Sequence, residues 1–403
     1  MPALLISLSN SSNHERNPMS LAVLTRPVAK PVKTTVWYTR CPVPSAWGVA
    51  LRAGHFHDEF SSDPEIEFRS VLDSADAKIH DAHFYGTLAN AFRLGGNIPP
   101  IWARSRGANT RVVGISWTTA TSPILTLPGS GIQGVADLKG KRLLVIRHPN
   151  EEIDFFQAGT LRIYETALAT AGLSLKDVTL VEKIAEGSTE HSKPKSASGG
   201  QPKRNYRGNQ GLTLVPLLRG EVDAIVSQGP AAINLRDGFG LHVVYDTSTH
   251  PDPIQRAHNS IPKLLTVDSG LIEERPEVVA RILARLLEIP AWAEENREQA
   301  VHFVAQEQRV SDDLVDEAYG EKFASELELN LSEENIARVA SQKAFLVKHG
   351  FIAKDFELDQ WIDPRPLAAA RRLVEEQRKS GASRRTSASP NSFRVGAAGC
   401  VSR

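Results

Sequence analysis

The strongest constraint on the fold is an alternation of short strand-like runs with longer segments of helical spacing. The runs are rich in β-branched and aromatic residues, and in the segments between them apolar residues recur every three or four positions. The strand-like runs are residues 34–39, 65–71, 111–117, 142–146, 178–181, 222–227 and 241–245. Such alternation is typical of α/β folds, so we predict an α/β chain with largely parallel sheets.

Two segments near the C-terminus carry the apolar stripes of buried helices. Residues 276–296 start with Pro276, which suits the first turn of a helix, and Glu277 complements the helix dipole. Residues 335–350 repeat the spacing and end at Gly350, a residue type common at helix ends. We interpret both stripes as core and not as a cofactor-binding surface.

Two further stretches resemble the periplasmic-binding-protein fold of type II. The run VADLKGKRLLV at 135–145 resembles the turn, short helix and strand that open the second lobe of that fold. The run LLRGEVDAI at 217–225 resembles the helix and strand near the end of the same lobe. The resemblance implies a two-lobed fold with a ligand cleft between the lobes. Its expected boundaries are 34–120 plus 262–370 for lobe 1 and 121–261 for lobe 2.

Polar, low-complexity segments flank and interrupt these lobes. Residues 1–33 lack sustained periodicity, and we expect a flexible arm there. Residues 378–403 are rich in Ser, Ala, Gly and Arg without any acid, so we expect a disordered tail. Residues 187–211 are basic and glycine rich but lack the spacing of a Walker loop or a dinucleotide fingerprint. That segment favours a mobile surface loop over a phosphate cradle.

Charge and hydropathy exclude several partners. Lys plus Arg and Asp plus Glu each number 47, so the formal net charge is zero and no overall field favours nucleic acid or an anionic membrane. The apolar runs near the N-terminus are too short for a signal peptide or a membrane helix. We therefore expect a cytoplasmic monomer without nucleic-acid or membrane partners, with organelle targeting by the Ser- and Arg-containing arm as the alternative.

Cys41 follows the first strand-like run, in the sequence YTRCPVP. The other cysteine, Cys400, lies in the tail, so neither a disulfide nor a cysteine-based metal site is expected. A lone cysteine is often an inert buried group. Here, however, a predicted helix at residues 45–53 directs its N-terminus toward the thiol. Helix N-termini and nearby cations lower the pKa of a thiol, and Arg40 and Arg93 are candidate cations.

His83, Arg93 and the pair Gly95-Gly96 supply the other groups of a candidate site. A guanidinium beside flexible backbone amides suits a carboxylate, a sulfinate or a phosphate. The alternatives are a core histidine at 83, a structural ion pair at Arg93 and a tight turn at the two glycines. Together with Cys41 these groups fit nucleophilic or acid-base chemistry on an anionic substrate.

Three motifs, YTRCPVPSA, HFYGTLANAFRLGGNIPP and FELDQWIDP, closely resemble the aryl sulfinate desulfinases of the dibenzothiophene desulfurisation pathway. The resemblance extends over about residues 34–370. It implies hydrolytic cleavage of the carbon-sulfur bond of an organic, aromatic sulfinate, with release of sulfite and without cofactor or metal. It also implies that Cys41 is the essential cysteine, His83 the histidine that closes over it and Arg93 the sulfinate anchor. Gly95 or Gly96 would offer backbone amides.

Departures from the family pattern concern the substrate more than the chemistry. Thr39 stands where the family has a serine, which keeps a hydroxyl two residues before Cys41, and we expect Thr39 to contact the substrate. Leu88 replaces a polar amide, and no tryptophan aligns in the lid-like segment 154–159. Phe84, Phe155 and Phe156 can form either a substrate pocket or part of the core. We expect Phe84 to contact the substrate.

The sequence leaves the mechanism and a rival function open. The thiolate of Cys41 can attack sulfur, or the thiol can protonate the ipso carbon while Arg93 holds the departing sulfur dioxide equivalent. The rival is a non-catalytic cytosolic small-anion binding protein of the solute-binding superfamily. The thiamine-pyrimidine branch of that superfamily is marked by a cysteine-rich motif that this chain lacks. We favour the desulfinase interpretation.

Overall fold

The computed structural model describes residues 33–185 and 206–387, without the side chains of residues 77, 80, 81, 83, 206–210 and 380–387. Its strands are β1 (Thr34–Arg40), β2 (Ile66–Ser70), β3 (Ala91–Gly96), β4 (Thr110–Ser116), β5 (Pro123–Thr126), β6 (Arg142–Arg147), β7 (Thr179–Ile184), β8 (Ile225–Val226), β9 (His242–Asp246), β10 (Lys263–Asp268) and β11 (Leu329–Asn330). Its α-helices are α1 (Ala46–Arg52), α2 (His55–Phe60), α3 (Ala77–Tyr85), α4 (Ile98–Ser105), α5 (Phe155–Ala169), α6 (Tyr206–Leu218), α7 (Gly229–Phe239), α8 (Ser269–Glu274), α9 (Pro276–Glu295), α10 (Arg297–Gln308), α11 (Asp313–Tyr319), α12 (Glu333–Lys348) and α13 (Arg365–Ser387). In these two ranges no helix has both the length and the apolar character needed to span a bilayer.

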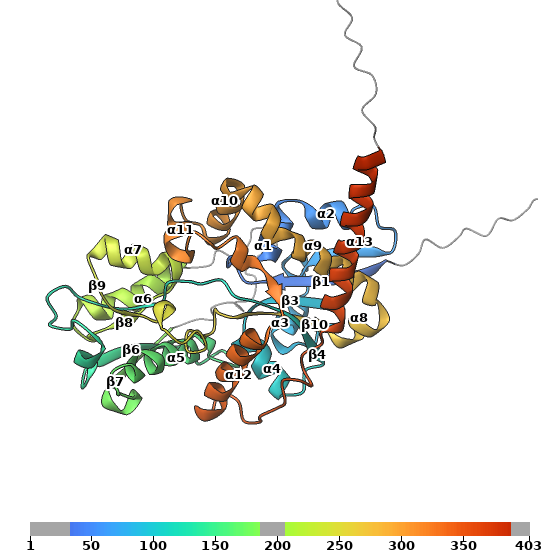
Figure 1. The fold of residues 1–403 in the computed structure, drawn as a ribbon. Coiled ribbons are helices and arrows are strands. Elements are labelled where there is room, and N and C mark those ends of the chain that lie inside the picture. Colours follow the sequence, from blue (N-terminus) through green and yellow to red (C-terminus); the bar gives the residue numbers. More distant parts are fainter. Residues whose placement is uncertain (1–32, 186–205, 388–403) are drawn as a thin grey trace, which may run out of the picture.

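The strands divide into two groups on opposite sides of the molecule (Figure 1). One group is a six-stranded sheet with the order β11-β4-β10-β3-β1-β2. The other consists of β8-β5-β9 and β6-β7, which a bridge between Leu143 and Ala224 connects. Helices α1, α9 and α13 lie on the side of the six-stranded sheet, and α6 and α7 on the side of the smaller sheets. The predicted α/β class is confirmed.

The expectation of largely parallel sheets is wrong. Strand β1 runs parallel to β2 and β3, and β6 runs parallel to β7, but β10 is antiparallel to both β3 and β4. Strand β5 is likewise antiparallel to β8 and β9. Strand β10 begins where the chain returns from the smaller sheets, so its first residue, Lys263, pairs with Gly96 at the end of β3. A strand that enters at that edge must run in the opposite direction.

Helix α9 confirms the predicted apolar stripe and covers one face of the six-stranded sheet. It begins at Pro276, and Val278, Ile282 and Leu283 are fully buried in the core that also contains strand residues of β1 and β3. Burial of such side chains contributes roughly 1.5–3 kcal/mol each relative to exposure. The helix therefore supplies much of the core beneath the strands that carry the candidate site.

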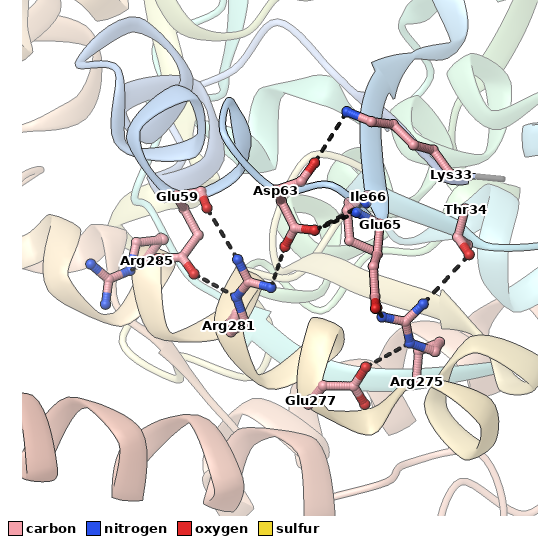
Figure 2. Close-up of polar contacts among 10 residues, drawn as sticks. All are labelled: Lys33, Thr34, Glu59, Asp63, Glu65, Ile66, Arg275, Glu277, Arg281 and Arg285. Atoms are coloured by element: carbon pink, nitrogen blue, oxygen red, sulfur yellow. Dashed lines mark hydrogen bonds and ion pairs between the residues drawn. The ribbon is translucent and has the colours of Figure 1, made fainter. Parts of the chain in front are cut away.

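Ion pairs tie α9 to the start of β1 and β2 (Figure 2). The Arg281 guanidinium donates to Glu59 at 2.5 Å and to Asp63 at 2.7 Å, and Arg275 donates to Glu65 at 3.1 Å. The hydrogen bond from Arg281 holds the pKa of Asp63 below its usual value. These contacts lie at the end of β1 opposite to Cys41, so we assign them to stability.

Two segments that we expected to lack regular structure are partly helical. Helix α6 begins at Tyr206, so residues 206–211 of the predicted surface loop belong to a helix. Helix α13 continues to Ser387, so residues 378–387 of the predicted tail are helical as well. Residues 378–387 contain Arg, Lys and Ala, which are good helix formers and let the packed helix continue outward. Residues 1–32, 186–205 and 388–403, with Cys400, lie outside the described residues.

Candidate functional site

Cys41 lies at the junction of β1 and α1. Its backbone N–H donates to the carbonyl of Leu94 at 3.0 Å, which extends the pairing of β1 with β3 by one residue. The N–H of Val43 then donates to the Cys41 carbonyl at 2.9 Å, and Ser45 caps α1 by accepting from the N–H of Gly48 at 3.2 Å. The thiol is half-buried and unpaired within the described part of the chain. Backbone contacts on both sides therefore fix its position.

Gly95 leaves the space that the thiol occupies. A Cβ atom built on Gly95 would overlap Sγ of Cys41, would lie 3.3 Å from Cys41 Cβ and would lie 3.7 Å from Nη1 of Arg93. The thiol and the guanidinium thus both approach the same point above Gly95. A Cβ on Gly96 would in turn lie 2.8 Å from both the carbonyl oxygen and Oδ1 of Asn259. Both glycines end strand β3, so the alternative of a tight turn is wrong.

Arg93 lies on the same face of the sheet as Thr39, directly opposite it in the register of β1 and β3. Its Nη1 donates to the carbonyl of Gly96 at 3.1 Å, which holds the guanidinium toward the end of the strand. Peptide groups alternate in direction along a strand. Because the Leu94 carbonyl faces Cys41, the N–H of Gly96 faces the same side. Of the two predicted amides, that of Gly96 is the one on the Cys41 side of β3.

A pocket with about 380 Å³ of unfilled space, open to solvent, adjoins Arg93. Its lining is mainly apolar, with a few polar groups: Phe84, Gly86, Leu88, Ala91, Phe92, Pro100 and Ala103, with Arg93, Thr110, Thr266 and Asp268. Arg93 therefore borders both the thiol and an apolar pocket, and Leu88 adds to the apolar character.

One of the three aromatic residues considered from the sequence, Phe84, lines this pocket. Phe84 is buried, and its ring centroid lies 6.2 Å from that of Phe155 at the start of α5. Phe156 is more exposed and packs on the ring of His148 at 4.7 Å. His83 lies on α3, next to Phe84, but its side chain is outside the described atoms. Its approach to Cys41 stays a prediction.

Arg40 anchors the cysteine loop to α10. It forms an ion pair with Glu307, whose side chain is 5% exposed, and Gln308 Nε2 donates to the carbonyl of Pro42. Burial lowers the pKa of Arg40, and Arg52 lowers it further. The charge of Arg40 is compensated by Glu307, so its role is to hold the loop. The sequence offered no signal for Glu307 or Gln308, because the packing of α10 on α1 brings them to the residues on either side of Cys41.

Lys263 is a buried charged group, opposite the end of β3, that the sequence did not reveal. It pairs with Gly96 on one side and with Ser116 on the other, and it is only 2% exposed. Burial lowers the pKa of Lys263 to about 7, while the charges of Glu326 and Cys41 oppose that shift. A lysine so fully buried is unusual unless it has a partner.

The chain segments that cross between the two groups of strands are held to the end of β3. Asn97 Nδ2 donates to the carbonyls of His258 and Pro262 at 2.7 and 2.8 Å. His258 Nδ1 accepts from the N–H of Ser260 at 3.2 Å, so its Nε2 carries the proton and donates to Ser122 at 3.1 Å. Burial lowers the pKa of His258 to about 3, which keeps the ring neutral. This histidine is structural.

The third motif, FELDQWIDP, is also structural. Trp361 is fully buried, and its Nε1 donates to Thr110 Oγ1 at 3.3 Å. The backbone of Val112 on β4 bonds both to Trp361 and to Asp363, at 2.9 Å each. The motif thus holds strand β4, the neighbour of β10, in place through backbone hydrogen bonds.

Comparisons with known proteins agree with this architecture. A family described as NMT1/THI5 like matches residues 96–190. The 2'-hydroxybiphenyl-2-sulfinate desulfinase of Rhodococcus erythropolis is 25% identical over 356 residues, which cover 83% of this chain and 92% of that protein. The same relation holds for the enzyme of that name from Rhodococcus qingshengii.

Solved structures extend the comparison to the fold. A mutant of DszB in complex with biphenyl-2-sulfinic acid superimposes with a TM-score of 0.67 at 23% identity, over 85% of this chain and all of that one. The periplasmic aliphatic sulphonate binding protein SsuA from Escherichia coli gives 0.59 at 16% identity, over 82% and 92%. The chain therefore has the two-lobed periplasmic-binding-protein-like type II fold, and over most of its length it is similar in sequence to 2'-hydroxybiphenyl-2-sulfinate desulfinase.

Proposed function

We propose that this protein cleaves the carbon-sulfur bond of an organic, aromatic sulfinate and releases sulfite. The observation that carries the proposal is that the Cys41 thiol and the Arg93 guanidinium both approach the same point above Gly95, and that Arg93 also lines an apolar pocket. The sequence similarity to a sulfinate desulfinase supports the same reaction. Thiol, cation and apolar pocket are the groups that a sulfinate on an aromatic ring requires.

Each group has a distinct role in this proposal. Arg93 binds the sulfinate oxygens, and the N–H of Gly96 adds a second donor. The apolar lining, including Phe84, accepts the ring. Thr39 contributes a hydroxyl on the same face as Arg93. His83, on the helix above the pocket, closes over the thiol and exchanges protons with it.

The overall reaction is ArSO₂⁻ plus water giving ArH plus HSO₃⁻, and two routes satisfy it. In the first, the thiolate of Cys41 attacks sulfur, the carbon-sulfur electron pair stays on the ring carbon, and that carbon takes a proton. Water then cleaves the cysteine-bound sulfur group to release sulfite. In the second, the Cys41 thiol protonates the ipso carbon, and the sulfur dioxide that leaves is hydrated. Either route uses only water as co-reactant, so we propose a cofactor-independent enzyme that works in the cytoplasm as a monomer.

The test is release of sulfite by the purified protein from biphenyl-2-sulfinate and 2'-hydroxybiphenyl-2-sulfinate. We expect sulfite from the wild type and from a Cys400→Ser control, and none from Cys41→Ser. If the wild type releases no more sulfite than Cys41→Ser but binds the sulfinates in calorimetry, the chain is an anion-binding protein without this catalysis. If it neither binds nor cleaves them, both functions fail.

A further inference from the structure

Helices α5 and α12 belong to different lobes and lie side by side (Figure 1). On α5, the Tyr164 hydroxyl donates to the carbonyl of Leu144 on β6 at 2.9 Å, which ties this helix to the lobe of the smaller sheets. On α12, Asn335 Nδ2 donates to Asn330 on β11 at 2.8 Å, which ties this helix to the lobe of the six-stranded sheet. Every contact between α5 and α12 therefore joins the two lobes.

Arg162 on α5 forms the buried part of this junction. Its side chain is largely enclosed, with the residue 6% exposed. Nη2 donates to Ser341 Oγ at 2.8 Å, and the guanidinium lies 5.5 Å from the centroid of the Phe345 ring, both on α12. Nε donates to the carbonyl of Ala257 at 3.3 Å, in the segment that leads back to β10. Separation of the lobes would break all three contacts together.

Glu165 forms the outer part of the same junction, one turn along α5. Its Oε2 accepts from Lys348 Nζ at 2.9 Å and from His349 Nε2 at 2.7 Å, at the end of α12. Burial raises the pKa of Glu165, but the hydrogen bonds from Lys348 and His349 outweigh it and hold that pKa below its usual value. Between the two polar contacts, Leu161 of α5 and Leu346 of α12 belong to one continuous apolar core. The junction thus combines packing with directed hydrogen bonds.

Helices α7 and α11 make a second junction on another side of the molecule (Figure 1). On α7, Leu235 is buried in the core of the smaller sheets, whereas Ile233 is buried in the core of the six-stranded sheet. Arg236 of α7 forms an ion pair with Glu317 of α11. One helix therefore contributes side chains to the cores of both lobes.

We infer that the two helix pairs, α5 with α12 and α7 with α11, clasp the lobes and fix the width of the cleft before any ligand binds. Two-lobed binding proteins commonly enclose a ligand by hinge closure. Here a hinge motion would have to pull apart a shared apolar core and the buried bonds of Arg162. The lobes accordingly move as one body, and a ligand enters a cleft that is already formed. This inference concerns the arrangement of the lobes and does not rest on the proposed reaction.

The experiment measures the distance between the lobes by double electron-electron resonance. The background is Cys41→Ser with Cys400→Ser, which leaves no native thiol. Nitroxide labels are placed at Lys176→Cys in one lobe and Lys322→Cys in the other, both at exposed positions. We expect one narrow distance that changes by less than about 1 Å when biphenyl-2-sulfinate is added.

Variants of the junction test its role. Arg162→Met with Glu165→Gln removes the polar contacts of α5 to α12, so the ligand-free distance should broaden and its mean should shift by more than about 2 Å. Glu182→Gln is the matched control, because its partner Arg147, 3.0 Å away, lies in the same lobe. The control should leave the distance distribution unchanged.

The ligand-free measurements decide the inference even if no sulfinate binds, so a failure of the proposed function is a separate result. A broad or two-peaked distance distribution in the background protein would overturn the inference, and so would a shift of more than about 2 Å on addition of the sulfinate. A narrow, unshifted distribution in Arg162→Met with Glu165→Gln would show that the clasp does not set the cleft. If that variant does not fold, Glu165→Arg, which places like charges opposite Lys348, is measured in its place with the same criterion.

Discussion

Gly95→Ala tests whether the position of the thiol, rather than its presence, determines catalysis. The new methyl group would overlap Sγ of Cys41, so sulfur and methyl must separate by roughly 1 Å or more to reach an ordinary contact. The same methyl group would lie 3.7 Å from Nη1 of Arg93, which is already an ordinary contact. The substitution therefore displaces the thiol and leaves the guanidinium in place.

The expected magnitude follows from that displacement. A misplacement of about 1 Å at a reacting group costs on the order of 10²-fold in rate, so kcat should fall about a hundredfold. The affinity for the sulfinate should change little, because Arg93 and the apolar pocket are untouched. Crowding of a packed site should also lower the free energy of unfolding by about 1–3 kcal/mol.

The assay combines sulfite release, calorimetry with biphenyl-2-sulfinate and urea unfolding. Gly238→Ala is the matched control, because its position on α7 is exposed and a Cβ there meets no atom within 4 Å. If folded Gly95→Ala releases sulfite at the wild-type rate, the thiol does not need the position that Gly95 gives it. A loss of sulfinate affinity equal to the loss of rate would instead place the effect on the anchor.

Three further predictions concern charged side chains. Arg93→Lys keeps the charge but loses the planar fork, so sulfinate affinity measured by calorimetry should fall about tenfold or more, and unchanged binding would remove Arg93 from the site. Glu307→Gln leaves the partly buried Arg40 without its counter-charge, so the free energy of unfolding in urea should fall by about 3 kcal/mol. A loss below about 0.5 kcal/mol would show that the pair does not hold the loop. The pKa of Asp63 is lowered chiefly by Arg281, so this stabilisation is present above the ordinary Asp pKa of about 4 and is lost as pH falls through the lower folded pKa. Arg281→Met should therefore lower the melting temperature at pH 6 and have a much smaller effect near pH 3, and an equal effect at both pH values would contradict the assignment.

Local patterns in the sequence predicted the elements that carry the thiol. The β-branched run before Cys41 is strand β1, and the helix expected after it is α1, although it begins one residue later because Ser45 is its cap. The apolar stripe of α9 is buried as its spacing indicated. These features depend on neighbours in the chain, so a single sequence contains them.

The order and the direction of the strands could not be predicted from the sequence in the same way. The position of β10 between β3 and β4 depends on where the chain returns to the six-stranded sheet. Lys263 on that strand reads as an ordinary surface lysine in the sequence, and burial alone makes it unusual. The need for glycine at position 95 is likewise invisible until the sulfur of Cys41 is placed over it.

The sequence by itself therefore determined the α/β class, the strand and helix that flank Cys41, and the resemblance that names a sulfur oxyanion as ligand. Only the tertiary structure decided which groups surround Cys41 and its loop: Arg93 across Gly95, and Glu307 paired with Arg40. The physical reason is that periodicity and residue preference express short-range backbone energetics. The charge environment of a thiol depends instead on strands and helices that are distant in sequence and that packing brings together.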